Sequence, residues 1–366
     1  MRSPARIVML AVVLVFVGCK RKAPPRPTPP TLEEAEAFGK QYASAKVPCD
    51  VSKLDKLVDL DLILARAVEG TTMSSDFVRG VRRGMKPDDI LCADVFGPGS
   101  SAVYLRTQTI DGTLRPLIRL VGDEGYTYER LELDRRADKI VVADIYNFAN
   151  GAQHSGVFGN MLKALADQGG ATELTQITRL RLDGKLTEAL ALFQTLPAKL
   201  RATKEMMLLE VQLALTLDNT IAMPVFERFV KAFPDDPSLL INNIDRLGLA
   251  KEYEQQLAAI DKLDRAVGGD PYLELARADA YEALGRSDKA FAAVTRAATT
   301  EPLLVQAQWL LLSLQIKLGQ FREAVVTTAH LKDKLAADIT RETLGGDDRF
   351  KALVDTPEFI AWESAK

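Results

Sequence analysis

Histidine and cysteine are scarce in this chain of 366 residues. There are two histidines, His154 and His330, and three cysteines. So few histidines leave little material for a histidine-based metal site, or for a Ser-His-Asp or Cys-His catalytic relay. We therefore predict a protein that is not an enzyme and that holds no metal and no cofactor.

An excess of charge of one sign is also lacking. The 47 Lys and Arg residues nearly balance the 50 Asp and Glu residues, and no block of five like charges occurs. This balance argues against nucleic acid as a partner. The phosphate-loop, H-E-x-x-H, C-x-x-C and calcium-loop motifs are absent as well. A hydrophobic share of 47% is that of a globular protein, which excludes a largely disordered chain.

A short hydrophobic segment opens the chain. Arg2 and Arg6 precede an uncharged run from Ile7 to Gly18, IVMLAVVLVFVG. A helix needs about 20 apolar residues to cross a bilayer, so this run has the length of the hydrophobic part of a signal peptide. We predict that residues 1–18 are a signal peptide.

The hydrophobic run ends in Phe16-Val17-Gly18-Cys19, with a small residue directly before a cysteine. This arrangement resembles the bacterial lipobox, although Phe16 stands where that family usually has Leu. The resemblance implies that Cys19 is acylated on sulfur and becomes the first residue of a lipoprotein in the cell envelope. The resemblance to sorted lipoproteins of double-membrane bacteria further implies, from Lys20 in place of Asp after the cysteine, the outer membrane, facing the periplasm. The alternatives are an uncleaved anchor, or ordinary cleavage that leaves Cys19 as a thiol.

Residues 19–30 are predicted to join this anchor to the folded protein. Lys20-Arg21-Lys22 would lie at the lipid headgroups, where each base is worth about 1 kcal/mol against anionic lipid. The segment 24–30 contains five prolines, which favour a stiff polyproline II spacer of about 3.1 Å per residue.

Cys49 and Cys92 remain as an even pair in an oxidising compartment. A disulfide between them would contribute about 3–4 kcal/mol by closing the intervening loop. The alternative is a pair of buried thiols.

Residues 31–160 change from a helical to a strand pattern. Thr31 and Glu34 form a capping box at the start of a first helix. A second helix begins at Asp50 or Ser52 and carries Leu57, Leu60, Leu64 and Val68 along one side, and a third covers residues 74–85. Strands are predicted over residues 101–109, 115–121, 126–133 and 139–146, with Val103, Leu105 and Thr107 on one face and a hairpin turn at Asp111-Gly112.

This order indicates an α+β domain with an antiparallel four-stranded meander packed on helices. Element order and size resemble the nuclear-transport-factor-2-like and cystatin-like folds, in which a curved sheet wraps a helix and leaves a conical pocket. The resemblance implies an alternative function, small-ligand binding or enzymatic activity in that pocket. The polar groups available for it are Tyr104, Tyr126, Tyr128, Tyr146, Asp123, Glu124, Glu129 and Glu132. We interpret the tyrosines as core residues with satisfied hydroxyls, the acids at 123 and 124 as turn residues, and His154 as a solvated residue.

A 34-residue period appears after residue 160. Leu284-Gly285 recurs as Leu318-Gly319 and Ala290 recurs as Ala324, while Ala222 and Pro234 precede Ala290 and Pro302 by twice that period. The pattern resembles tetratricopeptide repeats. The resemblance implies an all-α solenoid over residues 161–338, with five units at about 170–202, 203–236, 237–270, 271–304 and 305–338. The third unit is degenerate, with Ala250-Lys251 at the Leu-Gly place and Gln256 at the alanine place. Residues 339–366 are predicted to form an amphipathic capping helix with Phe350, Leu353, Phe359 and Trp362.

In tetratricopeptide arrays the first helix of each unit lines a concave groove that holds a peptide or a partner helix. Helical spacing places Asn242, Asp245, Asp279, Trp309 and Ser313 toward that groove; the alternative is that Trp309 packs between repeats and the others are solvated. We predict a membrane-anchored envelope lipoprotein that acts as a protein-interaction scaffold or adaptor, with an unidentified envelope protein or peptide as its partner. A structural lipoprotein without a dedicated partner is a further alternative.

Replacing Cys19 with Ser tests the anchor. The variant should leave the membrane fraction and lose labelling by radioactive fatty acid, because no acceptor sulfur remains. Fractionation of cells and acyl labelling measure both effects. Unchanged retention of the variant in membranes would contradict lipidation as the means of anchoring.

Overall fold

The computed structural model describes residues 28–71, 73, 75–84, 91–92, 100–122 and 125–365. The predicted signal peptide, Cys19 and most of the proline-rich linker lie outside the described residues, as do Asp123 and Glu124. None of the described helices is long and apolar enough to cross a membrane.

The first part of the chain is α+β. Its elements are α1 (Leu32–Lys46), α2 (Val51–Leu57), α3 (Leu60–Ala67), α4 (Ser75–Gly84), β1 (Ser101–Ile110), β2 (Thr113–Gly122), β3 (Gly125–Arg136), β4 (Lys139–Asn147) and β5 (Ala152–Gln153). The strands form one antiparallel sheet in the order β1-β2-β3-β4-β5. The predicted helices-then-meander order is confirmed, and the short β5 adds a fifth strand to it.

Local signals set several of these boundaries. Thr31 and Glu34 form the capping box of α1, with both reciprocal hydrogen bonds present. At the β1–β2 turn Asp111 and Gly112 both have positive φ, 50° and 73°. Two successive left-handed residues are what a two-residue type I′ hairpin requires.

The prediction of one second helix is wrong, because two helices, α2 and α3, occupy this segment. α2 ends at Leu57, and Val58 forms an isolated parallel bridge with Val142 of β4. Asp59 then donates its N–H to the Val142 carbonyl (3.0 Å) and caps α3 by accepting from the Leu62 N–H (2.9 Å). Pairing with the sheet therefore replaces the helical hydrogen bonds at this point. Asp50 caps α2, accepting from the Lys53 N–H (3.1 Å).

A bulge in β1 overturns the predicted face of that strand. The register with β2 shifts between Tyr104 and Arg106, so Leu105 is an extra residue. An extra residue reverses the alternation of side chains beyond it. Thr107 consequently lies on the side of Tyr104, with 3.0 Å between the two hydroxyl oxygens, and does not share a face with Val103 and Leu105.

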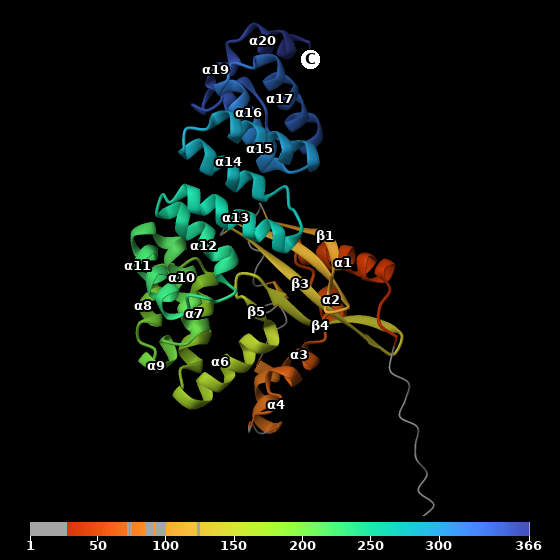
Figure 1. The fold of residues 1–366 in the computed structure, drawn as a ribbon, viewed down its shortest axis with the longest axis vertical. Coiled ribbons are helices and arrows are strands. Elements are labelled where there is room, and N and C mark those ends of the chain that lie inside the picture. The colour runs from red at the N-terminus through yellow and green to blue at the C-terminus, as the bar shows by residue number, and fades with distance from the viewer. Residues whose placement is uncertain are drawn as a thin grey trace, which may run out of the picture.

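One face of the sheet packs on α1, α2 and α3 (Figure 1). The buried side chains of this first core include Phe38, Tyr42, Leu54, Ile63, Ile118, Leu131, Val142 and Ile145. Among the described residues these side chains fill the space between the sheet and α1. The structure thus shows a packed core where the nuclear-transport-factor-2-like resemblance implies a conical pocket.

The rest of the chain is helical. Its elements are α6 (His154–Gln168), α7 (Ala171–Leu182), α8 (Leu186–Phe193), α9 (Ala198–Arg201), α10 (Lys204–Leu217), α11 (Asn219–Ala232), α12 (Leu239–Leu249), α13 (Tyr253–Val267), α14 (Leu273–Ala283), α15 (Ser287–Thr300), α16 (Val305–Lys317), α17 (Phe321–Leu335), α18 (Arg341–Gly345), α19 (Lys351–Val354) and α20 (Pro357–Ser364). Within this part of the structure, the pairs α7/α8, α10/α11, α12/α13, α14/α15 and α16/α17 pack as five hairpins in succession. We call these hairpins the array.

One turn recurs in the array. Gly184, Gly285 and Gly319 have φ near +70°, and Lys251 takes the same left-handed conformation (φ 60°) in the degenerate unit. The next residue always donates its N–H to the carbonyl five residues earlier at 2.8 Å, as Arg286 does to Tyr281 and Glu252 to Leu247. This is the Schellman ending of a helix. The degenerate unit therefore keeps the turn despite losing the glycine.

The alanines at the repeated position are fully buried: Ala189, Ala222, Ala290 and Ala324. Gln256 replaces alanine in the third hairpin and donates its side-chain amide to the Ile244 carbonyl at 3.1 Å. The room for it comes from Gly248, because a Cβ there would lie 2.6 Å from Gln256 Nε2. The larger side chain of Gln256 therefore fits because residue 248 of the same hairpin is glycine.

The predicted single capping helix over residues 339–366 is wrong, because three short helices, α18 to α20, occupy the segment. α18 ends at Gly345 with Gly346 as its C-cap, and Pro357 begins α20 with Thr356 as its N-cap. The segment nevertheless covers the last hairpin. Phe350, Leu353 and Phe359 are buried in one core with Leu312 and Leu331, and Trp362 is packed against it.

Cys49 and Cys92 are joined by a disulfide, with their Cα atoms 5.8 Å apart. Replacing Cys92 with Ser should lower the free energy of unfolding by roughly 3 kcal/mol, because the unfolded chain regains the entropy of the open loop. Urea unfolding under non-reducing conditions measures this. The wild-type protein treated with reductant is the control and should match the variant; equal stability of oxidised wild type and variant would contradict a stabilising bridge.

Candidate functional site

The second face of the sheet packs on the array. Leu117, Tyr128 and Phe148 of this face share a buried core with side chains of α12, α13 and α14, namely Ile241, Ile244, Ile260, Leu263, Val267 and Leu273. Figure 1 shows the strands running up to α12 and α13 on this side. The sheet is therefore held between α1–α3 and the middle of the array, so the chain itself covers part of the surface that was predicted to face a partner.

A buried arginine joins the two parts of the chain. Arg119 of β2 is 1% exposed, and its Nη1 lies 2.6 Å from Oδ1 of Asp270 in the α13–α14 turn. Its Nη2 lies 2.6 Å from Oε1 of Glu301 at the end of α15. The Tyr128 hydroxyl donates to the other oxygen of Asp270 at 2.7 Å. We call these four residues the Arg119 cluster.

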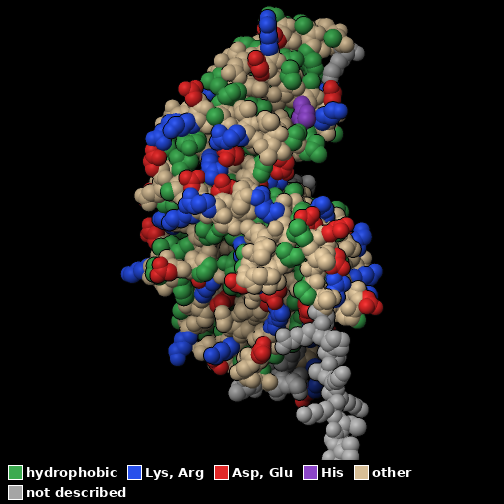
Figure 2. Space-filling view, turned by 45° about the vertical axis from the view of Figure 1, so that its right-hand side comes forward, with side chains coloured by type: hydrophobic (Ala, Val, Ile, Leu, Met, Phe, Trp, Pro, Cys, Tyr) green, Lys and Arg blue, Asp and Glu red, His purple; other side chains and the backbone are tan. Residues whose placement is uncertain are grey.

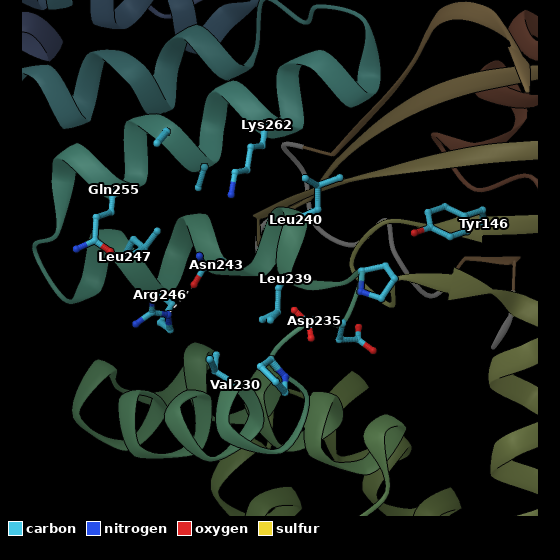
Figure 3. A pocket seen from close by; sticks show the side chains of 15 residues that line it. Tyr146, Val230, Asp235, Leu239, Leu240, Asn243, Arg246, Leu247, Gln255 and Lys262 are labelled. Atoms are coloured by element: carbon cyan, nitrogen blue, oxygen red, sulfur yellow. Dashed lines mark hydrogen bonds between the residues drawn. The ribbon is translucent and has the colours of Figure 1, made fainter.

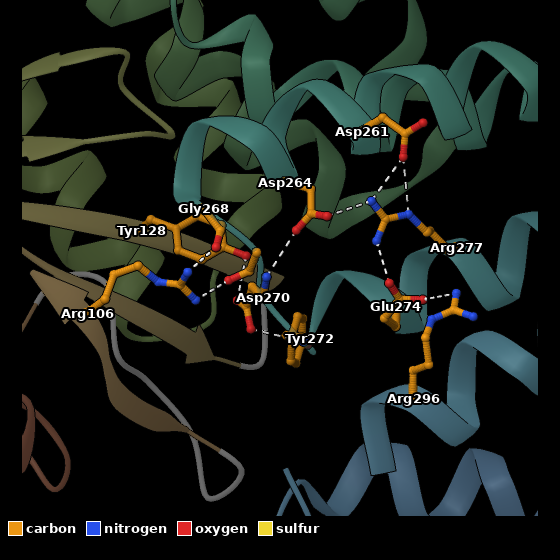
Figure 4. Close-up of polar contacts among 11 residues, drawn as sticks. Arg106, Tyr128, Asp261, Asp264, Gly268, Asp270, Tyr272, Glu274, Arg277 and Arg296 are labelled. Carbon is orange, nitrogen blue, oxygen red and sulfur yellow. Dashed lines mark hydrogen bonds and ion pairs between the residues drawn. The ribbon is translucent and has the colours of Figure 1, made fainter. Parts of the chain in front are cut away.

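Further polar contacts hold the end of α13 against β1. The Arg106 guanidinium donates to the carbonyls of Gly268 and Gly269, and Gln108 donates to the Ala266 carbonyl at 3.0 Å. Figure 4 shows Arg106 directed at this turn. Because the last carbonyls of a helix lack partners within the helix, a guanidinium is a favourable cap for them.

The same turn is tied to the rest of the array. Asp270 donates its N–H to Asp264, whose other oxygen accepts from Arg277 at 2.9 Å. Arg277 also contacts Asp261 (3.0 Å) and Glu274 (2.7 Å), as Figure 4 shows. Charged hydrogen bonds thus connect Asp270, and through it the sheet, to α13 and α14.

Sequence reasoning missed the Arg119 cluster, although one signal was present. Arg119 lies in the run Leu117-Ile118-Arg119-Leu120-Val121, where apolar residues flank it on both sides. A charge in such a strand requires a buried partner. The sequence does not say which of the 50 acids supplies it. For Tyr128, the interpretation as a core residue with a satisfied hydroxyl agrees with the hydrogen bond to Asp270.

The residues predicted to line a groove lie in different surroundings. Asn242 donates its side-chain amide to the Ala149 carbonyl (2.8 Å) and so holds the turn between β4 and β5; its assignment to an open groove is wrong. Asp245 on α12 and Asp279 on α14 are exposed. Trp309 and Ser313 on α16 line a hollow with the terminal segment.

That hollow has a volume of about 490 Å³ and is bordered by α16, α18 and the loop before α19. Trp309 is half-buried in the core of the last hairpin, and its ring centroid lies 5.1 Å from that of Phe350. Leu310 and Leu344 add apolar surface, while Ser313, Gln306 and Arg349 add polar groups. Trp309 therefore packs against its neighbours, as the alternative interpretation has it, and also borders the hollow. We call this the Trp309 hollow.

A larger cleft of about 700 Å³ lies where α11 and α12 separate (Figure 3). Its walls are mostly apolar: Val230, Pro234, Leu239, Leu240, Leu247, Ala258 and Ala259. Tyr146, Asp235, Gln255 and Lys262 contribute polar groups. The turn before β5 packs nearby, since a Cβ on Gly151 would overlap the backbone of Ser238 in the α11–α12 linker. The docked sheet thus meets the array beside this gap.

The first core contains one buried ion pair. Lys46 Nζ lies 3.1 Å from Glu129, which also accepts from the Tyr42 hydroxyl at 2.8 Å, and both charged side chains are at most 1% exposed. Burial opposes the ionisation of Glu129, but Lys46, His154 and the Tyr42 hydroxyl together outweigh it and hold the pKa of Glu129 below its usual range. Neither the cleft nor the Trp309 hollow reaches this pair, so it has a structural role in the arrangement observed.

His154 does not match its interpretation as a solvated residue. It begins α6, its ring lies 6.1 Å from that of Phe158, and its Nδ1 is buried without a hydrogen bond. Among the described residues, no group of His, Cys, Asp or Glu has an arrangement that could hold a metal ion.

The chain matches no protein-family model and no curated protein. Among solved structures, it is similar to MamA from residue 41 to its end, from Desulfovibrio magneticus RS-1, at 17% identity and a TM-score of 0.39 over 46% of this chain and 96% of that one. It is also similar to a MamA RS-1 ArsTM double mutant, at 16% identity and a TM-score of 0.38 over the same shares. Both scores are low, so the description of the array rests on its own hairpins.

Replacing Arg119 with Ala tests whether its cluster joins the two parts of the chain. The change leaves the Asp270 carboxylate buried without a counter-charge, which should lower the free energy of unfolding by about 3–5 kcal/mol. Urea unfolding followed by circular dichroism measures it. Arg296→Ala is the control, because that exposed arginine forms a surface pair with Glu274 and its loss should cost about 1 kcal/mol or less. Similar losses for the two variants would contradict the role given to Arg119.

Proposed function

We propose that this protein is a lipid-anchored scaffold of the bacterial cell envelope, without catalytic activity, whose array binds a segment of another protein. We further propose that the array is of the tetratricopeptide type. The support is the 34-residue period, the recurrent Schellman turn and the buried alanines at equivalent places. Anchoring is inferred from the signal-peptide pattern and Cys19.

The observation that carries this proposal is the Trp309 hollow. Aromatic side chains in a partly enclosed, mainly apolar hollow are typical anchors for a partner side chain. A volume of about 490 Å³ is ample for one large side chain and part of the backbone next to it. Because Trp309 is already held against Phe350, little rotamer entropy is lost when a partner binds.

The Trp309 hollow lies in a part of the array that the sheet does not cover. The sheet covers the middle of the array, whereas α16 to α20 extend beyond the sheet at the upper end in Figure 1. They lie away from α1, at which the chain from the predicted anchor enters the fold. A partner could bind at this end without displacing the sheet.

The two tryptophans of the chain provide a matched test. Both are half-buried in the core of the last hairpin, but only Trp309 borders the hollow. The full chain, Trp309→Ala and Trp362→Ala are used to capture proteins from native envelopes under identical conditions. We expect Trp309→Ala to capture at least about tenfold less of the partner than wild type does, since truncating a hot-spot residue costs more than 1.4 kcal/mol of binding free energy.

Trp362→Ala is the control for general damage to the last hairpin, and thermal unfolding of both variants confirms that they are folded. Capture of the same partner by wild type and Trp309→Ala in equal amount would overturn the assignment of the hollow. If neither the wild-type chain nor the variants capture any protein above background, the scaffold proposal itself is contradicted.

A further inference from the structure

The cleft of about 700 Å³ between the second and third hairpins is separate from the Trp309 hollow. Its apolar wall includes Leu239, Leu240 and Leu247 of α12, with Val230 of α11 on the other side (Figure 3). Val230, Leu239 and Leu240 are only half-buried. This junction of the array therefore leaves apolar surface facing the cleft.

Two cations border the cleft without a carboxylate partner. Lys262 projects from α13 toward α12 (Figure 3), is exposed, and forms no hydrogen bond or ion pair with a described residue. Arg246 of α12 donates its Nε to the side-chain oxygen of Asn243 at 2.6 Å and forms no ion pair with the described part of the chain. Both cations are thus available to an anion that enters the cleft.

The two acids at the cleft do not neutralise these cations. Asp236 is already paired with Lys204, at 2.8 Å. Asp235 is exposed and lies on the α11–α12 linker, apart from Lys262 (Figure 3). Lys262 and Arg246 against Asp235 alone leave an excess of positive charge beside the apolar wall.

The next junction of the array shows what a cation at the Lys262 position binds. One 34-residue period later, Arg296 takes the place of Lys262, and Glu274 takes the place of Leu240. There, Nη2 of Arg296 lies 2.7 Å from Oε2 of Glu274. A leucine therefore stands at the cleft where the next junction has the carboxylate that meets this cation.

Two further exchanges at the cleft remove the other ion pairs of the junction. In the next junction Arg277 is paired with Asp264 at 2.9 Å and with Glu274 at 2.7 Å. Asn243 and Val230 stand at the places of Arg277 and Asp264 one period earlier. The cleft thus keeps the cation of α13 but lacks the carboxylates, so a carboxylate from outside the chain would restore the missing pair.

The docked sheet fixes one wall of the cleft. The Asn242 amide donates to the Ala149 carbonyl at 2.8 Å, and Gly151 packs against Ser238, so the start of α12 is held by the turn before β5. A binding surface that is fixed in advance loses less conformational freedom when a partner binds.

We propose that this cleft binds an acidic and apolar segment of another protein, in which an Asp or Glu carboxylate pairs with Lys262 and neighbouring apolar side chains pack on α12. Clefts of this size, with mostly apolar walls and a few polar groups, are typical binding sites and are frequent where domains meet. The charged pair would fix the orientation of the segment, because charge complementarity contributes mainly to specificity. The inference rests on the proposed scaffold function, since the occupant is a protein segment, and adds a second contact to the Trp309 hollow.

The test uses a probe peptide of defined sequence. N-acetyl-Leu-Glu-Leu-Leu amide is titrated into the full chain carrying labelled leucine and valine methyl groups, and the NMR signals of Val230, Leu239, Leu240 and Leu247 are followed. We expect saturable shifts with a dissociation constant on the order of 1 mM, about −4 kcal/mol. N-acetyl-Leu-Gln-Leu-Leu amide has nearly the same shape without the charge. It should bind about fivefold more weakly, because an exposed ion pair is worth up to about 1 kcal/mol.

Matched variants assign this preference to Lys262. Lys262→Gln should bind both peptides equally, whereas Lys334→Gln, which removes the same charge from an exposed site on α17, should keep the fivefold preference. Leu240→Glu supplies the carboxylate that Glu274 supplies in the next junction. It should also abolish the preference, because Lys262 then has a partner within the chain. Thermal unfolding of each variant confirms that it is folded.

Equal binding of the two peptides by wild type, no saturable shift from either, or an unchanged preference in Lys262→Gln would each overturn the proposal. Saturable shifts of the same methyl signals by dodecanoate, but by neither peptide, would overturn it in favour of a lipid ligand. The scaffold proposal is tested apart from this, by capture of proteins from native envelopes with Trp309→Ala. Failure of one proposal therefore leaves the measurement for the other unchanged.

Discussion

The arrangement of the whole molecule depends on one buried cation. Arg119 projects from the middle of the sheet into the array, where carboxylates from the α13–α14 turn and from the end of α15 receive it. Removing an arginine from water is costly unless its donors are paired with good geometry. The contact consequently tolerates few orientations of the sheet against the array, while the apolar core around Leu117 and Tyr128 supplies the area buried between them.

Docking of the sheet changes what the array can bind. A free array of helical hairpins offers a continuous concave surface, but here the β4–β5 turn takes up Asn242 and the sheet covers α12 and α13. The Trp309 hollow lies in the part of the array beyond the sheet (Figure 1) and remains open to a partner. The first part of the protein thus limits which surface of the second part a partner can reach.

The degenerate third hairpin is the part of the array on which the sheet packs. Its sequence departs from the repeat at Lys251 and Gln256, yet the turn is kept and Gly248 makes room for the glutamine. The same hairpin carries most of the contact with the sheet, through Ile241, Ile244 and Ile260. Its departure from the repeat pattern coincides with a surface that packs on the chain itself rather than on solvent.

The sequence by itself determined those features that depend on neighbouring residues: the Thr31 capping box, the Asp111-Gly112 hairpin, the meander and the recurring turns of the array. Periodicity also identified Trp309 and Ser313, which line one hollow. Only the tertiary structure decided the helix break at Val58-Asp59, the bulge at Leu105 and the contact of Asn242 with the β4–β5 turn. Each of these depends on partners distant in the chain, as Arg119 and Asp270 are separated by 151 residues. Local patterns show which side of an element is apolar or charged, whereas what covers that side is decided by packing.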